Sequence, residues 1–484
     1  MSEENDKWLD KVMTSGGVNR RRFLANTGKL GLAAMGTGML SNTLATAALA
    51  DTSFDWKKHK GSKIKLLMNK HPYTNATIAY LDNFKKLTGI DVDYDIFPED
   101  VYFQKVTSAM SSGSTEYDVF MTGAYQLWQY GPAGYTVDLN PYLSDPNKTS
   151  DSYDWHDVHP GIRHALAWSG KVGDPLGGPN AHQWAVPMAH ELYSLSYNKY
   201  FLDKAGIKPP MDMPDLIDKA VHVQNYMKKN MNGGFGIATR GSRSWATIHP
   251  GYMSGLVNYG GTDFTHENGK LKSAVNSDAC KKWTKMWIDM EHKAGPSDWT
   301  SYTWYEVGQA LGGGKTAMIY DADIIGFFQQ QGTKEAGKIR SEAFKPNPDA
   351  DHVTSNIWIW ALAMSKFSKH KEPAWYFLQW ATGSKEQTFG ATQKKQVDPV
   401  RESVFKDPKY QHRLHKLFPG YTETYKKIVP HAKIEFTPQP LFFNVTTEWA
   451  AELQKMYNNQ VSVDEGLDRL AEKINHQMMS INNS

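Results

Sequence analysis

Short apolar segments alternate with amphipathic ones from residue 63 onwards, and this order limits the fold more than any other feature of the chain. Runs with strand character lie at 63–68, 90–96 and 117–121, and helical spacing of apolar residues occupies 74–87 and about 100–112. The strand–helix–strand–helix–strand order predicts an α/β fold.

The rest of the chain continues this alternation without an obvious domain linker. Strands are predicted at 192–197, 236–239, 316–320 and 356–364, and an amphipathic helix at 463–478. Residues 145–187 have poor periodicity, so we expect long surface loops with short helices there. The chain after residue 50 exceeds what one hydrophobic core usually organises, which predicts two lobes. Because no linker divides them, the lobes should be interwoven.

The first 50 residues have the order of an export signal. The run NRRRFL at 19–24 follows a polar start and precedes an uncharged stretch, 30–50, that ends in Ala48-Leu49-Ala50. The pair Arg20-Arg21 resembles the twin-arginine pattern. Gly, Ser, Thr and Asn residues within 30–50 make this stretch unlike a membrane-spanning helix. We therefore expect export by the twin-arginine translocase and cleavage after Ala50.

Composition limits where the exported protein works and what it binds. No cysteine stands at the predicted cleavage point to carry a lipid anchor, so we expect a free, monomeric periplasmic protein. Without residues 1–50 the chain has 48 Lys and Arg (54 − 6) against 47 Asp and Glu (51 − 4), a balance that indicates no nucleic-acid or anionic-membrane partner. The one cysteine, Cys280, excludes an intrachain disulfide and should pack as a small apolar residue.

The run GGGKT at 312–316 is similar to a phosphate-binding loop but fails its requirements. Gln309 stands where that loop needs glycine, and the predicted order is helix, turn, strand instead of strand, loop, helix. Motifs for iron–sulfur clusters, haem attachment and dinucleotides are missing, so we expect no cofactor. No histidine pair has metal-ligand spacing, so we expect no metal. The 17 histidines include His182, His190, His249 and His266, and most of the 17 should be surface or loop residues.

Six segments, in this order, resemble the extracellular solute-binding proteins of ABC importers, in particular the sugar-binding family that includes the maltose-binding proteins. They are FKKLTGIDV (84–92), YDVFM (117–121), YNKYFLDKAGIKPP (197–210), GKTAM (314–318), AMSK (363–366) and AWYFLQW (374–380). The resemblance implies a type II-like periplasmic binding fold, in which two α/β lobes joined by a hinge of several chain crossings close over a solute. It places one lobe at about 62–189 and 352–398, and the other at about 190–351 and 399–484.

The resemblance also implies where a solute is bound, because such folds hold it where strands end at the cleft. It points to His71 after the first strand and to Thr122, Tyr125 and Gln126 after the third. Glu191 corresponds to a carboxylate at the lobe crossing that accepts hydrogen bonds from sugar hydroxyls.

Further candidates lie later in the chain. Asp321 follows a predicted strand, and Arg401 belongs to a loop that resembles one in sugar and polyol binders. Aromatic content is 12% with 16 Trp, more than core filling normally requires, and aromatic faces suit sugar C–H surfaces. Platforms are expected from Trp245, Trp304 and either Trp358 or Trp360, of which strand alternation should turn only one to the solute.

These features together predict capture of a sugar or polyol and its delivery to an ABC permease in the inner membrane. An acidic–basic pair common in maltose-type members is missing from 122–126, which argues against maltodextrin. Two alternatives stay open. Glu191 and Asp321 would suit a glycoside-cleaving enzyme if about 5–10 Å separated them. Several carboxylates facing the cleft would instead favour a polyamine as the solute.

Overall fold

The computed structural model describes residues 54–267 and 269–482, which belong to one compact unit. The predicted export signal at 1–50 lies outside the described residues. Within the described ranges, none of the helices combines the length and apolar character needed to span a bilayer.

A parallel three-stranded sheet forms the centre of the first lobe. β1 (Lys63–Asn69) lies between β2 (Asp91–Phe97) and β3 (Val119–Gly123) and pairs with both in parallel. Its helices are α3 (Pro72–Ile78), α4 (Leu81–Thr88), α5 (Glu99–Ser111) and α6 (Ala124–Tyr130). This is the predicted βαβαβ order, except that the helix expected at 74–87 is divided in two. Tyr80 interrupts it with a non-helical backbone and stacks on Phe389, with 4.3 Å between ring centroids.

The second lobe is built on β10 (Thr316–Ala322), which is parallel to β7 (Phe235–Ala238). Its helices are α9 (Lys199–Ala205), α10 (Met213–Asn230), α11 (Gly251–Asn258), α12 (Asp278–Ala294), α13 (Trp304–Gly313) and α14 (Asp323–Phe328). α13 is capped by Gly314, whose φ of 73° is left-handed, and β10 begins two residues later. The GGGKT run is therefore a turn from helix to strand, as predicted.

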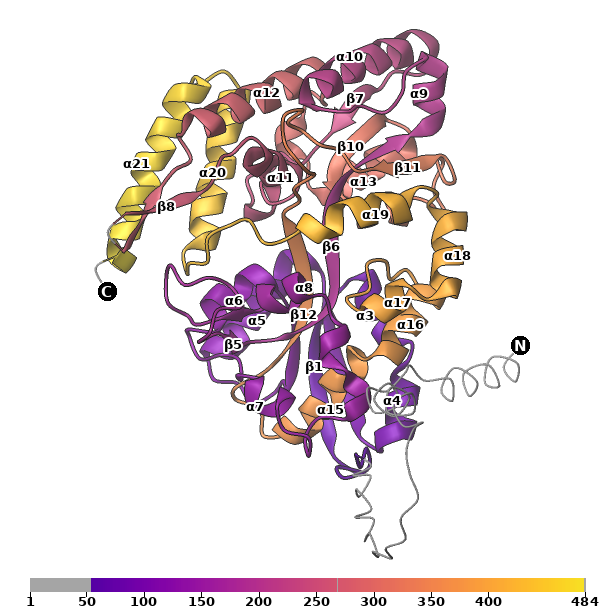
Figure 1. The fold of residues 1–484 in the computed structure, drawn as a ribbon, viewed down its shortest axis with the longest axis vertical. Coiled ribbons are helices and arrows are strands. Elements are labelled where there is room, and N and C mark those ends of the chain that lie inside the picture. The colour runs from indigo at the N-terminus through magenta and orange to yellow at the C-terminus, as the bar shows by residue number, and fades with distance from the viewer. Residues whose placement is uncertain (1–53, 268, 483–484) are drawn as a thin grey trace, which may run out of the picture. The chain divides into compact units, whose positions relative to one another are not determined.

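Two long strands cross between the lobes. β6 (Val186–Asn198) pairs antiparallel with β12 (Ile357–Met364) through its first half, and with β10 and β11 (Ile339–Glu342) through its second. β12 also pairs antiparallel with β3. The sheet therefore runs in the order β2-β1-β3-β12-β6-β10-β7 through both lobes (Figure 1). The chain enters the second lobe along β6 and returns along β12, so the lobes are interwoven.

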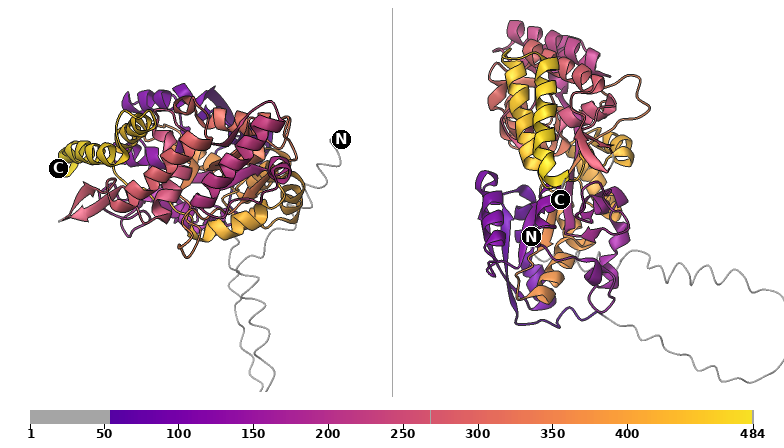
Figure 2. Two further views of the ribbon diagram at one scale, coloured as in Figure 1. Left: turned by 90° about the horizontal axis from the view of Figure 1, so that it is seen from above. Right: turned by 90° about the vertical axis from the view of Figure 1, so that its left-hand side faces the viewer.

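The C-terminal part of the chain is helical. Its elements are α15 (Lys371–Ala381), α16 (Ser384–Gln393), α17 (Glu402–Phe405), α18 (Pro408–Leu417), α19 (Tyr421–Ile428), α20 (Phe442–Tyr457) and α21 (Val463–Asn482). α20 and α21 pack side by side against α12 of the second lobe (Figure 2). The helix predicted at 463–478 is therefore present and longer.

Short elements complete the fold. They are α7 (Asn140–Leu143), α8 (Pro160–Ala165), the strand pairs β4 (Ala167–Trp168) with β5 (His182–Gln183) and β8 (Phe264–Glu267) with β9 (Lys270–Ser273), and five 3-10 turns at 151–153, 155–157, 245–247, 299–301 and 429–431. Residues 145–187 are thus loops with short helices, as predicted.

The single cysteine and several tryptophans belong to the core. Cys280 is fully buried, as predicted. Seven tryptophans are also almost completely buried and fill the core: Trp128, Trp168, Trp283, Trp287, Trp299, Trp375 and Trp449. Seven of the 16 tryptophans in the sequence therefore fill the core.

Candidate functional site

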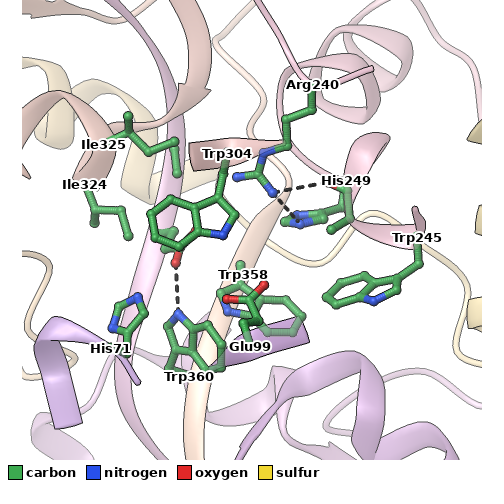
Figure 3. A pocket seen from close by; sticks show the side chains of 13 residues that line it. His71, Glu99, Arg240, Trp245, His249, Trp304, Ile324, Ile325, Trp358 and Trp360 are labelled. Carbon is green, nitrogen blue, oxygen red and sulfur yellow. Dashed lines mark hydrogen bonds between the residues drawn. The ribbon is translucent and has the colours of Figure 1, made fainter. Parts of the chain in front are cut away.

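A cavity lies where the crossing strands β6 and β12 pass between the lobes (Figure 3). All the empty space within its bounds, open solvent included, is about 400 Å³, and the space that the centre of a water molecule can reach is about 30 Å³. The lining residues are His71, Glu99, Glu191, Arg240, Trp245, Ala246, His249, Trp304, Ala322, Ile324, Ile325, Trp358 and Trp360.

Strand ends bring these residues together. Three strands end two residues before a cavity residue: β1 before His71, β7 before Arg240 and β10 before Ile324. Polar and apolar side chains of both lobes therefore meet at the carboxyl ends of strands, where open α/β sheets generally bind ligands.

Four tryptophans line the cavity. Trp358 and Trp360 both face it, with ring centroids 5.1 Å apart and planes at 86°. The prediction that only one of them does so is wrong, because residues two apart on a strand lie on the same face. Trp245 lies 5.4 Å from Trp358, and Trp304 stacks on Tyr305 at 3.8 Å. Their indole faces suit the C–H surface of a solute.

Glu191 is the carboxyl group of the crossing strand that reaches the cavity, as predicted. Trp360 Nε1 donates a hydrogen bond of 2.9 Å to its Oε1, and the residue is only 6% exposed. Burial raises the pKa of Glu191 to about 8, although Arg240 opposes the shift. The group can therefore accept or donate hydrogen bonds near neutral pH.

His71 lines the cavity from the first lobe, as predicted. It caps α3, and its Nδ1 accepts a hydrogen bond of 3.3 Å from the backbone N–H of Tyr73. Burial lowers the pKa of His71 to about 3, so the imidazole is neutral and Nε2 carries its proton. Its ring centroid lies 5.0 Å from that of Trp360.

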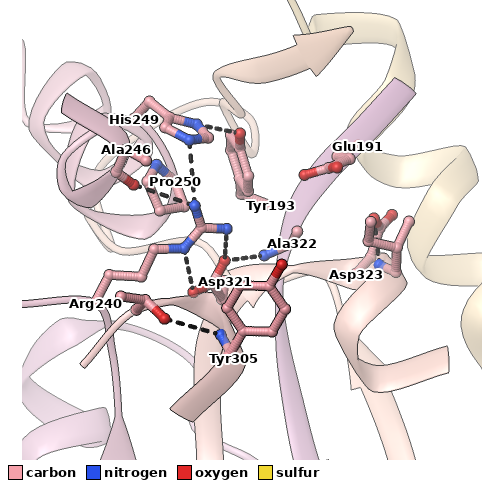
Figure 4. Close-up of polar contacts among 12 residues, drawn as sticks. Glu191, Tyr193, Arg240, Ala246, His249, Pro250, Tyr305, Asp321, Ala322 and Asp323 are labelled. Carbon is pink, nitrogen blue, oxygen red and sulfur yellow. Dashed lines mark hydrogen bonds and ion pairs between the residues drawn. The ribbon is translucent and has the colours of Figure 1, made fainter. Parts of the chain in front are cut away.

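Arg240 is held on three sides by protein groups (Figure 4). Its Nε and one terminal nitrogen donate to the two oxygens of Asp321, at 3.0 and 2.7 Å. The other terminal nitrogen donates to the carbonyl of Ala246 at 3.1 Å and lies 3.2 Å from His249 Nε2. Asp321 is fully buried behind this guanidinium group and does not itself line the cavity.

The three residues predicted on the loop after β3 do not line the cavity. Thr122 belongs to β3, whereas Tyr125 and Gln126 belong to α6; all three side chains are buried. The Tyr125 hydroxyl donates to the carbonyl of Ile357, and its ring lies 5.3 Å from that of Trp358. The segment is helical from Ala124 onwards and packs against Trp358 instead of reaching the cavity.

Arg401 is also buried away from the cavity, which corrects its predicted role. Its Nε donates to the carbonyl of Thr382 at 2.7 Å, and one terminal nitrogen donates to that of Asp154 at 2.9 Å. The guanidinium carbon lies 4.8 Å from the ring centre of Tyr153. These contacts stabilise the loop that contains Arg401, because a buried guanidinium group donates to the nearest carbonyl acceptors.

Sequence reasoning missed several lining residues, notably Arg240, Glu99 and His249. A signal existed for Arg240, because it directly follows the predicted strand 236–239 and strand ends line such clefts. His249 lies in the turn between the 3-10 helix at 245–247 and α11; it is only 3% exposed and its ring stacks on Trp245, with 5.5 Å between centroids. His190 is likewise fully buried.

Comparison with known proteins identifies relatives of this chain. A family described as bacterial extracellular solute-binding proteins matches residues 70–388. An erythritol/L-threitol-binding protein of Mycolicibacterium smegmatis is 37% identical, over 94% of this chain and 95% of that protein. A mannitol-binding protein of Pseudomonas aeruginosa is 23% identical, over 71% of each chain.

A solved structure supports the fold. The ABC transporter solute-binding protein of Agrobacterium vitis, with bound D-mannitol, matches with a TM-score of 0.71 and 22% identity, over 87% of this chain and 99% of that one. This likeness confirms the predicted two-lobe α/β fold. Because the family match spans more than half of its residues, the chain belongs to the bacterial extracellular solute-binding proteins.

Proposed function

We propose that this protein captures a small, neutral polyhydroxylated solute between its lobes and delivers it to the permease of an ABC importer. The observation that carries the proposal is the small cavity in which four tryptophans surround Glu191 and Arg240. A short alditol of about four to six carbons offers the C–H surface and hydroxyl groups that these side chains can bind. The relative named for binding erythritol and L-threitol supports the same class.

Each side chain has a distinct task in this proposal. Indole faces of Trp358 and Trp245 cover the C–H surface of the solute, which supplies much of the affinity. Glu191 and Arg240 recognise hydroxyl groups by accepting and donating hydrogen bonds. Because the lining residues come from both lobes, closure around the solute completes the site and excludes water.

Binding without chemical conversion is the better interpretation of the carboxyl groups. An acid and a base made of Glu191 and Asp321 would need both groups at the solute, but both oxygens of Asp321 accept hydrogen bonds from Arg240. The relatives named for their solutes bind erythritol, L-threitol and mannitol, which favours a polyol over a polyamine.

Calorimetric titration and thermal-shift measurements of the protein without residues 1–50 test the proposal. Erythritol, L-threitol, ribitol and mannitol form one panel, and maltose and putrescine serve as contrasts. We expect at least one alditol to raise the melting temperature through mass action. If only putrescine or maltose did so, or if an oligosaccharide were cleaved by the wild type but not by Glu191→Gln, the proposal would be wrong.

The export route is a separate part of the proposal. We infer a monomeric periplasmic protein, exported by the twin-arginine translocase, with lobes at 62–189 plus 352–398 and 190–351 plus 399–484. The Arg20-Arg21 pair supports the export route. The lobe boundary near residue 190 is supported by β6, which changes its pairing partner from β12 to β10 between Leu192 and Tyr193. Replacing both Arg20 and Arg21 with Lys should leave the precursor in the cytoplasm; normal periplasmic recovery would contradict the route.

A further inference from the structure

The guanidinium of Arg240 has little hydrogen-bonding capacity left for a solute. Arginine carries five N–H bonds. Two point to Asp321, one to the carbonyl of Ala246 and one to His249 Nε2. Only one N–H, on the nitrogen that also donates to Asp321 Oδ1, remains for the cavity. A single N–H matches one hydroxyl oxygen, whereas a carboxylate is bound best by two parallel N–H bonds.

The partners of Arg240 are themselves fixed. Arginine can only donate, so His249 Nε2 is the acceptor and the proton of its neutral ring lies on Nδ1, which donates to the Tyr193 hydroxyl at 2.5 Å. Burial, with the charge of Arg240, lowers the pKa of His249 well below its usual value, so the ring stays neutral. Asp321 Oδ1 also accepts from the backbone N–H of Ala322 at 2.6 Å. The guanidinium is therefore locked in place.

The charge of Arg240 is also compensated. Asp321 is fully buried and forms a bidentate ion pair with it. Among the described residues that line the cavity, Arg240 is the only permanent cation, while Glu99 and Glu191 contribute carboxyl groups. A negatively charged solute would find no uncompensated positive charge among these lining residues to balance it.

We infer that Asp321 and His249 are specificity-determining residues, which hold Arg240 as a donor of one hydrogen bond and so select a neutral alditol against the corresponding sugar acid. The inference rests on the proposed function and adds a class of excluded solutes. Neither residue needs to touch the solute, because each acts through Arg240. Removing either partner frees at least one N–H, and removing Asp321 also frees the charge.

The test compares the dissociation constants of erythritol and erythronate by calorimetry at neutral pH, or of another alditol and its aldonate if the panel favours it. The wild type should bind the alditol at least about 100-fold more tightly. In Asp321→Asn this ratio should fall by about 10- to 100-fold, the contribution of a hydrogen bond to a charged group. His249→Phe, which keeps an aromatic ring beside Trp245, should lower the ratio in the same direction.

Glu291→Gln is the matched control, because it also removes a buried carboxyl group of the second lobe. Glu291 accepts a hydrogen bond from Thr239, next to Arg240, but does not line the cavity. Its ratio should equal that of the wild type. Because each ratio compares two solutes on one protein, a general loss of stability cancels.

The outcomes separate this inference from the proposed function. If the wild type bound no neutral alditol, the proposed function would fail and the inference with it. If it bound both solutes equally, or if the ratio were unchanged in Asp321→Asn and His249→Phe, the inference alone would be refuted. Should Asp321→Asn fail to fold, an unchanged ratio in folded His249→Phe would be sufficient to overturn it.

Discussion

Gly123, the last residue of β3, allows Trp358 to occupy its place in the cavity wall. A Cβ atom on Gly123 would lie 1.9 Å from Cη2 and 2.2 Å from Cζ2 of Trp358. Ordinary contact begins at 3.4 Å, so the indole would have to retreat by about 1.5 Å, the difference between 3.4 and 1.9 Å. Gly123 itself has an extended backbone, with φ −107° and ψ 164°, that alanine adopts freely. The effect of Gly123→Ala is therefore steric.

Overpacking of this kind costs about 1–3 kcal/mol of unfolding free energy. The indole is bounded by the rings of Trp245, His249 and Trp360, so the space into which it can retreat is the cavity. A solute that binds must then displace the Trp358 indole from the cavity and so restore the steric strain against the new methyl group. The same 1–3 kcal/mol should appear as an affinity about 5- to 150-fold weaker. Calorimetric titration with the bound alditol measures this loss.

Two comparisons make the prediction specific. Gly313→Ala is the matched control, because a Cβ there meets no atom within 4 Å and its affinity should be unchanged. Trp358→Phe removes the two ring atoms that the new methyl group would meet, so Gly123→Ala should cost less in that background. Wild-type affinity and stability in Gly123→Ala, or purely additive effects of the two substitutions, would refute the steric argument.

Three further predictions concern the cavity, the Arg401 loop and the pH dependence of stability. Trp360→Phe removes the N–H that Glu191 accepts and should weaken alditol binding about 10-fold in calorimetry, whereas unchanged affinity would deny this bond a role. Arg401→Met should lower the unfolding free energy measured in urea by about 2–4 kcal/mol and leave the affinity for the alditol unchanged. If the folded variant bound the alditol more weakly, Arg401 would have a role in binding. Burial raises the pKa of Glu291 from 4.5 to about 8, so the folded chain keeps a proton that the unfolded chain loses, and stability falls as the pH rises from 5 to 8. Glu291→Gln should remove about 3 kcal/mol of that fall, and parallel pH profiles of variant and wild type would contradict the assignment.

Local patterns in the chain were sufficient to predict most elements of the fold. Strands were expected at 63–68 and 316–320 because apolar runs of this length are typical of buried strands. The interwoven lobes followed from the absence of a linker. The short strands β4, β5, β8, β9 and β11 went unpredicted because their apolar runs are brief. The break at Tyr80 also went unpredicted, because it depends on stacking against Phe389, which is 309 residues away in the chain.

The candidate site was predicted less completely, for reasons that Arg401 and Arg240 illustrate. Both are buried arginines, each near the end of a segment that returns to the junction of the lobes. Only Arg401 was expected to bind solute. In the structure Arg401 donates to the carbonyls of Thr382 and Asp154, which do not line the cavity, whereas Arg240 lines it. Hydrogen-bond partners of a long side chain are set by whichever acceptors the folded chain brings near, and spacing along the sequence does not specify them.

The sequence by itself determined the α/β class, because strand and helix periodicity are local properties, and its resemblance to a known family pointed to the crossing carboxylate Glu191 and the tryptophans of β12. Tertiary structure decided the rest. It placed both Trp358 and Trp360 on one face, put α6 behind them, and committed four of the five N–H bonds of Arg240 to the protein. These outcomes depend on which surfaces meet when two lobes close, and contacts between distant segments are fixed only by the packing of the whole fold.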